Sequence, residues 1–284
     1  MTGSESARPT VIRRALGSRS TWLGGACVVV YVMTALCAPL LAPYDPERLV
    51  GGSFASPSWA HWLGTDQLGR DLLSRVVYGA RLSLLAGVVS VTVAVVVGAT
   101  AGAMAGYFGG RVDAAIMRLI DVLLAFPGVL VALLVVTALR PGWGPVMLAV
   151  GLINVPVFCR QVRSTVLVVQ KLDYVVAAQA AGAGSGYVLR HVVLPTLVAP
   201  VVVLATLGLG TAILEVAGLS FLGIAGELTQ PEWGSMLNEA KNNLRSWGWR
   251  ALAPGAAISL AVIGFNLLGD GLRDALDPQL TRVR

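Results

Sequence analysis

The polar stretch DYVVAAQAAGAGSGYVLRHVVLP, residues 173–195, lies between two long apolar runs. Asp173 can cap a helix, and small or β-branched side chains fill the turns that follow it. Gly182 begins a glycine-rich break that permits a sharp change of direction. Pro195 is suited to the start of the next apolar helix, where its missing N–H costs little. The pattern predicts two short helices joined by a turn, held between two membrane spans.

The composition around this stretch is that of a membrane protein. The chain has 284 residues, of which 56% are hydrophobic and 13% are charged, whereas a soluble domain carries about 25% charged residues. Apolar runs of about 20 residues cross a hydrocarbon core of about 30 Å as helices. We therefore expect an all-α integral membrane protein with six transmembrane helices, at residues 22–41, 82–107, 119–139, 146–158, 197–219 and 252–268.

The basic residues predict the orientation of the chain. Lysine and arginine are more numerous in the segments that lie inside when the N-terminus is cytoplasmic, and cytoplasmic loops are enriched in them. This places both termini and residues 173–195 in the cytoplasm. The net charge of +6 comes from residues that flank apolar segments and do not form one patch with aromatics, so nucleic acid is not an expected partner.

Two long segments, 43–81 and 220–251, are expected on the outer side. From Asp71 onward, apolar residues recur at helical spacing, which predicts an amphipathic helix on the membrane face that leads into the second span. Asp66, Arg70 and Asp71 are expected to make turn and helix-cap contacts. An aromatic belt at the outer interface would include Trp59, Trp62, Trp233, Trp247 and Trp249.

Enzymatic and cofactor chemistry is not supported by the motifs. The run GAGSG, residues 182–186, has neither a preceding strand nor a following Lys-Ser/Thr, so it does not predict nucleotide binding. The two histidines, His61 and His191, fall on opposite sides of the membrane, and a lone histidine specifies no chemistry. The three cysteines lack metal-ligand spacing and are expected to pack. The chain is predicted to be non-catalytic, with no metal site.

Glu215 is an acidic residue inside an apolar run, near the outer end of the fifth span. Intramembrane acids are costly and usually face a bundle interior or an aqueous path. Two interpretations stay open: Glu215 lines the substrate path or an outer gate, or it is a helix-end carboxylate bonded to a neighbouring loop. Just after the last span, four charged residues either brace the 173–195 stretch or contact a partner; these are Asp270, Arg273, Asp274 and Asp277.

The spacing within residues 173–195 resembles the cytoplasmic loop of ATP-binding cassette (ABC) importer permeases, which reads Glu-Ala-Ala, three residues, Gly, nine residues, then Ile-x-Leu-Pro. Ala177 and Ala178 match the alanines, Gly182 matches the glycine, and Leu194 with Pro195 match the end. The glutamate position holds Val176. The contact made by that carboxylate in relatives is therefore not carried over to this chain.

Four further blocks narrow the resemblance to the dipeptide/oligopeptide/nickel branch of this family. They are HWLGTDQLGRDLLSRVVYGARLSL at 61–84, GYFGGRVDAAIMRLIDVLLAFP at 106–127, GLSFLG with PEWGSML at 218–237, and FNLLGDGLRDALDP at 265–278. The resemblance implies a type I ABC importer permease fold, with a cytoplasmic tail (1–20), a first span and outer segment (21–81), a permease core (82–272) containing a coupling loop (160–196), and a C-terminal tail (273–284).

The resemblance also implies function and partners. The chain would be half of a translocation pathway for di- or oligopeptides in a bacterial inner membrane. Its partners would be a homologous permease, ATPase subunits that hold ATP and Mg²⁺, an extracytoplasmic substrate-binding protein and the lipid bilayer; the chain itself would bind no cofactor. The residues expected to couple it to an ATPase are Asp173, Tyr174, Val176, Ala177, Ala178, Ala181, Gly182, Leu194 and Pro195.

Two alternatives remain at this point. A permease of the same fold could import nickel, haem or another small solute, because the side chains that face the path are not readable from the sequence. A stand-alone channel or secondary transporter would not need the Ala-Ala…Gly…Leu-Pro pattern, and it would more often show broken spans with charges at the midplane.

Overall fold

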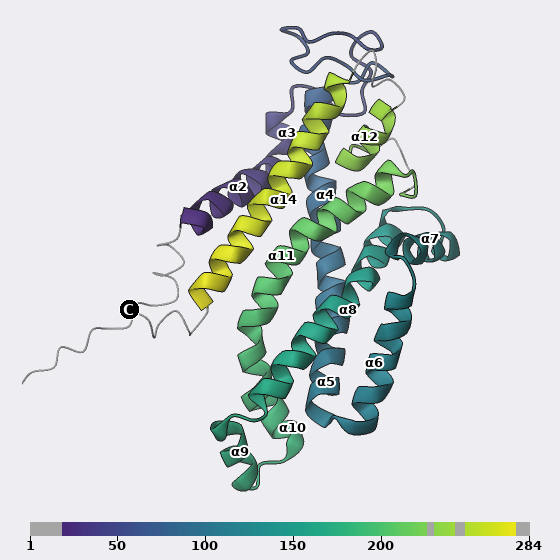
Figure 1. Ribbon diagram of the computed structural model, residues 1–284. Coiled ribbons are helices and arrows are strands. Elements are labelled where there is room, and N and C mark those ends of the chain that lie inside the picture. The colour runs from purple at the N-terminus through teal and green to yellow at the C-terminus, as the bar shows by residue number, and fades with distance from the viewer. Residues whose placement is uncertain (1–18, 226–229, 242–247, 277–284) are drawn as a thin grey trace, which may run out of the picture.

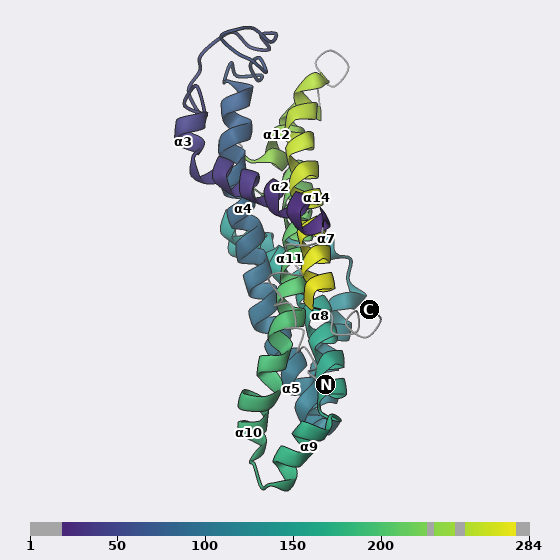
Figure 2. The ribbon, with the colours of Figure 1, turned by 90° about the vertical axis from the view of Figure 1, so that its left-hand side faces the viewer.

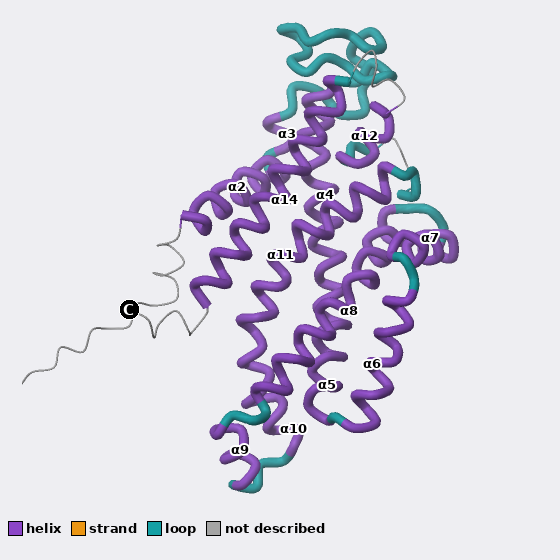
Figure 3. Tube along the Cα trace, in the orientation of Figure 1, coloured by secondary structure: helices purple, strands orange, loops and turns teal. Residues whose placement is uncertain are grey.

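The computed structural model describes residues 19–225, 230–241 and 248–276, and every regular element in these ranges is a helix (Figures 1 and 3). Four helical stretches are long and apolar enough to cross a membrane. They are α4–η1–α5 (Leu72–Ala94, Val95–Ala99, Thr100–Phe108), α8 (Trp143–Val169), α10–η2–α11 (Ser185–Tyr187, Val188–Val193, Leu194–Phe221) and α14 (Trp249–Leu276).

The span predicted at 119–139 is instead two helices, α6 (Gly110–Ala125) and α7 (Gly128–Leu139), which meet at an angle of 94°. The break falls at Pro127, because a proline pushes the preceding residue, Phe126, into extended backbone. Counting the bent pair as one span gives up to five. The expected first span is also interrupted: α2 (Arg19–Leu36) ends before α3 (Ala38–Leu41), and its apolar part is shorter than the other spans.

Three glycines at four-residue spacing allow the second span to lie directly against α8. Gly98, Gly102 and Gly106 face α8, and a Cβ on Gly98 would lie 2.7 Å from the Val155 carbonyl oxygen. A Cβ on Gly102 would overlap the Cys159 carbonyl oxygen. Small residues at this spacing let two backbones approach closely in lipid. This Gly-x-x-x-Gly-x-x-x-Gly run is visible in the sequence and could have predicted the close contact.

The two ends of the elongated molecule carry different structures (Figures 1 and 2). At one end lie α9 (Asp173–Ala180) and α10; at the other lie the irregular segment 42–71 and α12 (Trp233–Lys241). The prediction that an amphipathic helix lies on the membrane face from Asp71 onward is wrong. Asp71 caps α4 by accepting a bond from the Ser74 N–H, and the helix runs straight into the span with Arg75 fully buried.

The tryptophans predicted to form an aromatic belt differ in their exposure. Trp59 and Trp62 are exposed, whereas Trp233 is only 3% exposed and its indole N–H donates to the Val76 carbonyl at 2.9 Å. Trp233 is thus a core residue that fastens α12 to α4. Trp247 lies outside the described residues.

Candidate functional site

The polar stretch forms the two short helices that its sequence predicts. Leu172, and not Asp173, occupies the N-cap position of α9, so Asp173 lies in the first turn and makes no side-chain cap bond. The prediction that Asp173 caps this helix is therefore wrong. A carboxylate in the first turn still interacts favourably with the positive end of the helix dipole.

Gly182 ends α9 and turns the chain. Its φ is +87°, a conformation that glycine adopts without steric cost. The Gly182 N–H donates to the Gln179 carbonyl at 2.9 Å, and the Ala183 N–H donates to the Ala178 carbonyl at 3.1 Å. These two bonds are those of a Schellman motif, which satisfies the last carbonyls of a helix. The predicted break at Gly182 is confirmed.

We expected the second short helix to be separate from the following span, but the two are continuous. Residues 185–221 form one continuous helix of 37 residues, and Pro195 lies inside it. The six residues before Leu194, Val188–Val193, have π-helical geometry. Because a π segment departs from the regular i→i−4 bonding pattern that a proline would break, it accommodates Pro195 without a helix break. The helical segment α10 is therefore continuous with the long span.

Buried valines fix α9 to the spans. Val175 of α9 and Val188 of η2 are fully buried and pack with Val166 of α8. The side-chain amide of Gln170 also donates to the Gly106 carbonyl at 3.0 Å, which ties the end of α8 to α5. The bracket formed by residues 170–195 is thus held from both sides by packed side chains.

The remaining surface of α9 is exposed and almost uncharged. Tyr174 is 47% and Val176 is 50% exposed, and Ala177 is exposed beside them. Ala178 turns inward instead, toward the valine cluster. Of the two alanines in the motif, Ala177 alone is fully available to a partner. Ala181 and Pro195 are exposed as well, and Leu194 is 40% exposed.

Glu215 bonds to a neighbouring span rather than to a loop. The Asn154 side-chain amide donates to Glu215 Oε2 at 2.6 Å and also to the Val150 carbonyl at 3.0 Å. Asn154 belongs to α8 and lies two residues before Pro156, so the bond joins the middle of α8 to the outer part of α11. The interpretation that Glu215 bonds to a neighbouring loop is therefore wrong. The path-lining role stays a prediction.

Ion pairs join α6 to α8, and they were not predicted from the sequence. Arg163 of α8 makes two bonds to Asp113 of α6, at 2.5 and 2.6 Å, and Arg160 donates to Asp121 at 2.7 Å. Both arginines lie one helical turn or less apart and face the same neighbouring helix.

The end of α14, with Asp270, Arg273 and Asp274, lies well away from α9 in both ribbon views, so it does not brace the bracket (Figures 1 and 2). Asp277 lies outside the described residues.

The opposite end holds a buried cluster of four charged side chains. Arg70 Nε donates to Asp66 at 2.6 Å, and Glu239 of α12 accepts from Arg70 at 3.1 Å and from Arg75 at 3.2 Å. Burial raises the pKa of Glu239, while the neighbouring arginines oppose this rise. The predicted turn contacts of Asp66 are confirmed, since it also accepts from the backbone N–H groups of Leu68 and Arg70.

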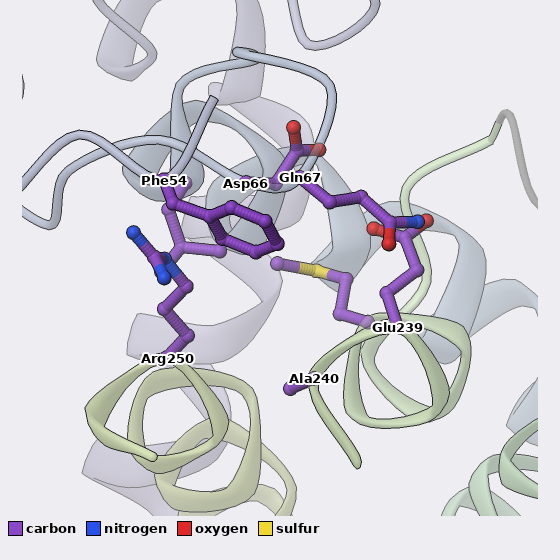
Figure 4. Close-up of a pocket in the computed structure, with 8 residues that line it drawn as sticks. Phe54, Asp66, Gln67, Glu239, Ala240 and Arg250 are labelled. Carbon is purple, nitrogen blue, oxygen red and sulfur yellow. The ribbon is translucent and has the colours of Figure 1, made fainter. Parts of the chain in front are cut away.

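A small cavity lies next to this cluster, between Asp66, Glu239 and Arg250 (Figure 4). Its volume of about 20 Å³ is room for about one water molecule, which excludes a peptide. Among the residues that the structure describes, no three His, Cys, Asp or Glu side chains are grouped so that they could hold a metal ion.

These features define a helical, multi-pass membrane protein whose long spans end in a short helical bracket. Comparison with known proteins makes the assignment specific. Residues 98–282 match the family described as binding-protein-dependent transport system inner membrane component, and the chain belongs to this family of ABC importer permeases. Membership of this family indicates that the protein lies in the bacterial inner membrane.

Individual relatives match almost the whole chain. The dipeptide transport system permease protein DppC of Alkalihalophilus pseudofirmus is 44% identical over 263 residues, covering 91% of this chain and 85% of the relative. The glutathione transport system permease protein GsiD of Pectobacterium atrosepticum is 44% identical over 274 residues, covering 94% and 90%. DppC of Haemophilus influenzae is 39% identical, covering 93% and 92%.

Proposed function

We propose that this permease carries di- or oligopeptides, including small peptides such as glutathione, across the inner membrane. The observation that carries this proposal is the similarity over most of the chain to permeases named for dipeptide and glutathione transport. Both kinds of substrate are short, polar molecules that contain one or a few amide bonds. A path for them needs hydrogen-bonding groups, and we propose that the bonded pair of Glu215 and Asn154 supplies some of them.

The proposed assembly contains four kinds of subunit. This chain pairs with a homologous permease; ATPase subunits, which hold ATP and Mg²⁺ and perform the hydrolysis, lie beneath; and a substrate-binding protein delivers peptide from outside. Both termini and α9 lie in the cytoplasm, as the distribution of lysine and arginine favours. The chain itself is a non-catalytic subunit.

Coupling is proposed to work through α9 as a rigid lever. Its exposed face, with Tyr174, Val176 and Ala177, fits into a groove of an ATPase subunit. Because Val175 and Val188 anchor the bracket to α8 and the 185–221 helix is continuous, closure of the ATPases tilts these spans together. ATP biases the pathway toward its outward-facing state only by as much as it binds that state more tightly.

The test is purification of the chain with whatever subunits accompany it, followed by uptake into proteoliposomes. Co-purification of an ATPase, together with ATP-dependent uptake of a labelled dipeptide or of glutathione, supports the proposal. ATP-independent flux by the chain alone would favour a channel or secondary transporter. A co-purified binding protein that retains nickel, haem or another solute in place of peptide would overturn the proposed substrate and leave the coupling role standing.

A further inference from the structure

An open groove of about 180 Å³ lies between the stretch η1–α5 and the start of α11. It is lined by Ala99, Thr100, Leu194, Leu197, Val198 and Val201. The one hydroxyl among them, on Thr100, donates to the Val96 and Val97 carbonyls of its own helix, so no polar group faces the groove. An apolar cavity of about 150 Å³ can hold a benzene-sized molecule. The groove therefore has room for part of a hydrocarbon chain and offers no bond to a polar ligand.

Two π-helical segments end at this groove. The segment η1 ends at Ala99, and η2 ends at Val193, directly before Leu194. These are the π-helical segments among the residues that the structure describes, and they come from helices far apart in the chain. Such segments are rare and frequently occur at functional sites. Their meeting at one place indicates that the groove is a specific feature of the surface.

The groove lies where the fifth predicted span begins. That span was predicted at 197–219, whereas the helix covers 185–221, which is about 55 Å at 1.5 Å per residue. Since a hydrocarbon core is about 30 Å thick, the first turns of this helix extend beyond it at the bracket end. The groove is also surrounded by exposed apolar side chains, which are those of Val96, Val97, Met104, Val198 and Val202. Lipid acyl chains are the solvent that such a surface fits.

One helical turn nearer the bracket, the character of the surface changes. Tyr187, Arg190 and His191 are all exposed, and the rings of Tyr187 and His191 stack with their centroids 4.6 Å apart. Arg190 lies about 6 Å from Leu194 along the helix. Within the described ranges, no carboxylate lies at ion-pair distance from Arg190. Aromatic rings and long cationic side chains are typical of the level of lipid headgroups.

We propose that this groove binds one acyl chain of an anionic phospholipid, and that Arg190 holds the phosphate group of the same lipid. The apolar groove and the cation occur in the order in which a phospholipid presents its chain and its headgroup. Basic pockets between spans are known to bind anionic headgroups. The proposed function makes this leaflet the inner one, but the site itself needs only a bilayer and does not rest on the transported substrate.

The experiment uses the chain purified with the subunits that accompany it, in phosphatidylcholine nanodiscs. These contain a trace of phosphatidylglycerol with a photoactivatable group on its acyl chain. Labelling of residues 194–201 is measured by mass spectrometry while unlabelled phosphatidylglycerol or phosphatidylcholine is added. In the wild type, we expect phosphatidylglycerol to displace the probe and added phosphatidylcholine to leave it bound.

Two variants separate the headgroup contact from the chain contact. Arg190→Gln should weaken binding of the probe roughly five-fold. Arg111→Gln, which removes an exposed arginine from α6, is the matched control and should bind as the wild type does. Val198→Trp fills the groove and should abolish labelling of residues 194–201, with the accompanying subunits recovered in wild-type amounts.

Three results would overturn the lipid site. Equal displacement by the two lipids would show that the headgroup is not recognised. Equal weakening by Arg190→Gln and Arg111→Gln would show a general effect of surface charge. Absence of labelling at 194–201 in the wild type would show that another subunit covers the groove. None of these measurements involves peptide uptake, so the proposed function stands or fails separately.

Discussion

Glu215 and Gly182 are the single residues on which most of the proposed mechanism depends. Glu215 receives its bond from Asn154, which lies two residues before Pro156 of α8, so a carboxylate and an amide meet between two spans. Gly182 sets the angle between α9 and the long span by a backbone conformation and not by a side-chain contact. A substitution at each position can therefore test the role proposed for that residue.

Glu215→Gln should lower peptide uptake and leave assembly intact. The glutamine carbonyl can still accept the bond from Asn154, while the ionisable oxygen is lost. Uptake in proteoliposomes should fall by roughly ten-fold, which corresponds to about 1.4 kcal/mol of lost interaction. Normal uptake by this variant would reject a path-lining role for Glu215 and leave it as a contact between α8 and α11.

Gly182→Val should uncouple ATP hydrolysis from transport. A β-branched residue at a φ of +87° is strained by about 1–3 kcal/mol, and the strain is relieved by changing the direction of α9. Gly186→Val is the matched control, because that glycine has open space around it and no positive φ. Uptake and ATP hydrolysis are measured on both variants; equal coupling in the two would contradict the docking role of α9.

At the scale of elements, close packing joins η1 and α5 to α8 along a seam of glycines. Gly98, Gly102 and Gly106 bring the two backbones together, and Gln170 adds a bond to Gly106 at the bracket end. The ion pairs of Arg160 and Arg163 then join α6 to the same helix. As a result, α8 is bound on two sides close to the place where it leads into α9.

Gly102→Val should separate these helices. The added side chain would overlap the Cys159 carbonyl, and because this is backbone, it cannot turn aside. Overpacking of this kind costs about 1–3 kcal/mol or more. Thermal unfolding in detergent should show a clear loss of stability, whereas Gly218→Val, at an open position on α11, should unfold as the wild type does. Equal stability of the two variants would show that the seam tolerates separation.

At the scale of the whole molecule, the two ends are built on opposite principles. The bracket end is held by valines and exposes an apolar helix face. The opposite end, with the irregular segment 42–71 (the cap), is held by buried charges and exposes Trp59 and Trp62. Continuous helices connect the two ends. In the proposed mechanism, these helices carry a change at one end to the other.

Arg75→Ala should destabilise the cap end. Arg75 is fully buried, and its removal leaves the Asp66 and Glu239 carboxylates with Arg70 as their remaining cationic neighbour in the cluster. Breaking a buried ion pair from one side costs about 3–5 kcal/mol. Arg48→Ala, at an exposed position of the cap, should change the free energy of unfolding by no more than about 0.5 kcal/mol. A small effect of Arg75→Ala on unfolding would show that the cluster is not what holds the cap.

Local chemistry made much of the fold predictable. Long apolar runs indicated helices, Gly182 indicated the turn, and Asp71 indicated a helix cap, because each depends on residues close together in sequence. The 94° bend at Pro127 and the continuity of the helix through Pro195 were not foreseen. A proline is compatible with either a bend or an accommodated π segment, and packing around it selects between them.

The sequence by itself determined that this is a helical membrane permease, because hydropathy, charge bias and the Ala-Ala…Gly…Leu-Pro spacing are properties of the chain and need no partner. Only the tertiary structure decided which side chains act together. It turned Ala178 inward and Val176 outward, paired Glu215 with Asn154, and gathered Arg70, Arg75 and Glu239 from distant segments. Contacts between residues far apart in the chain depend on how helices pack, and local sequence does not encode that packing.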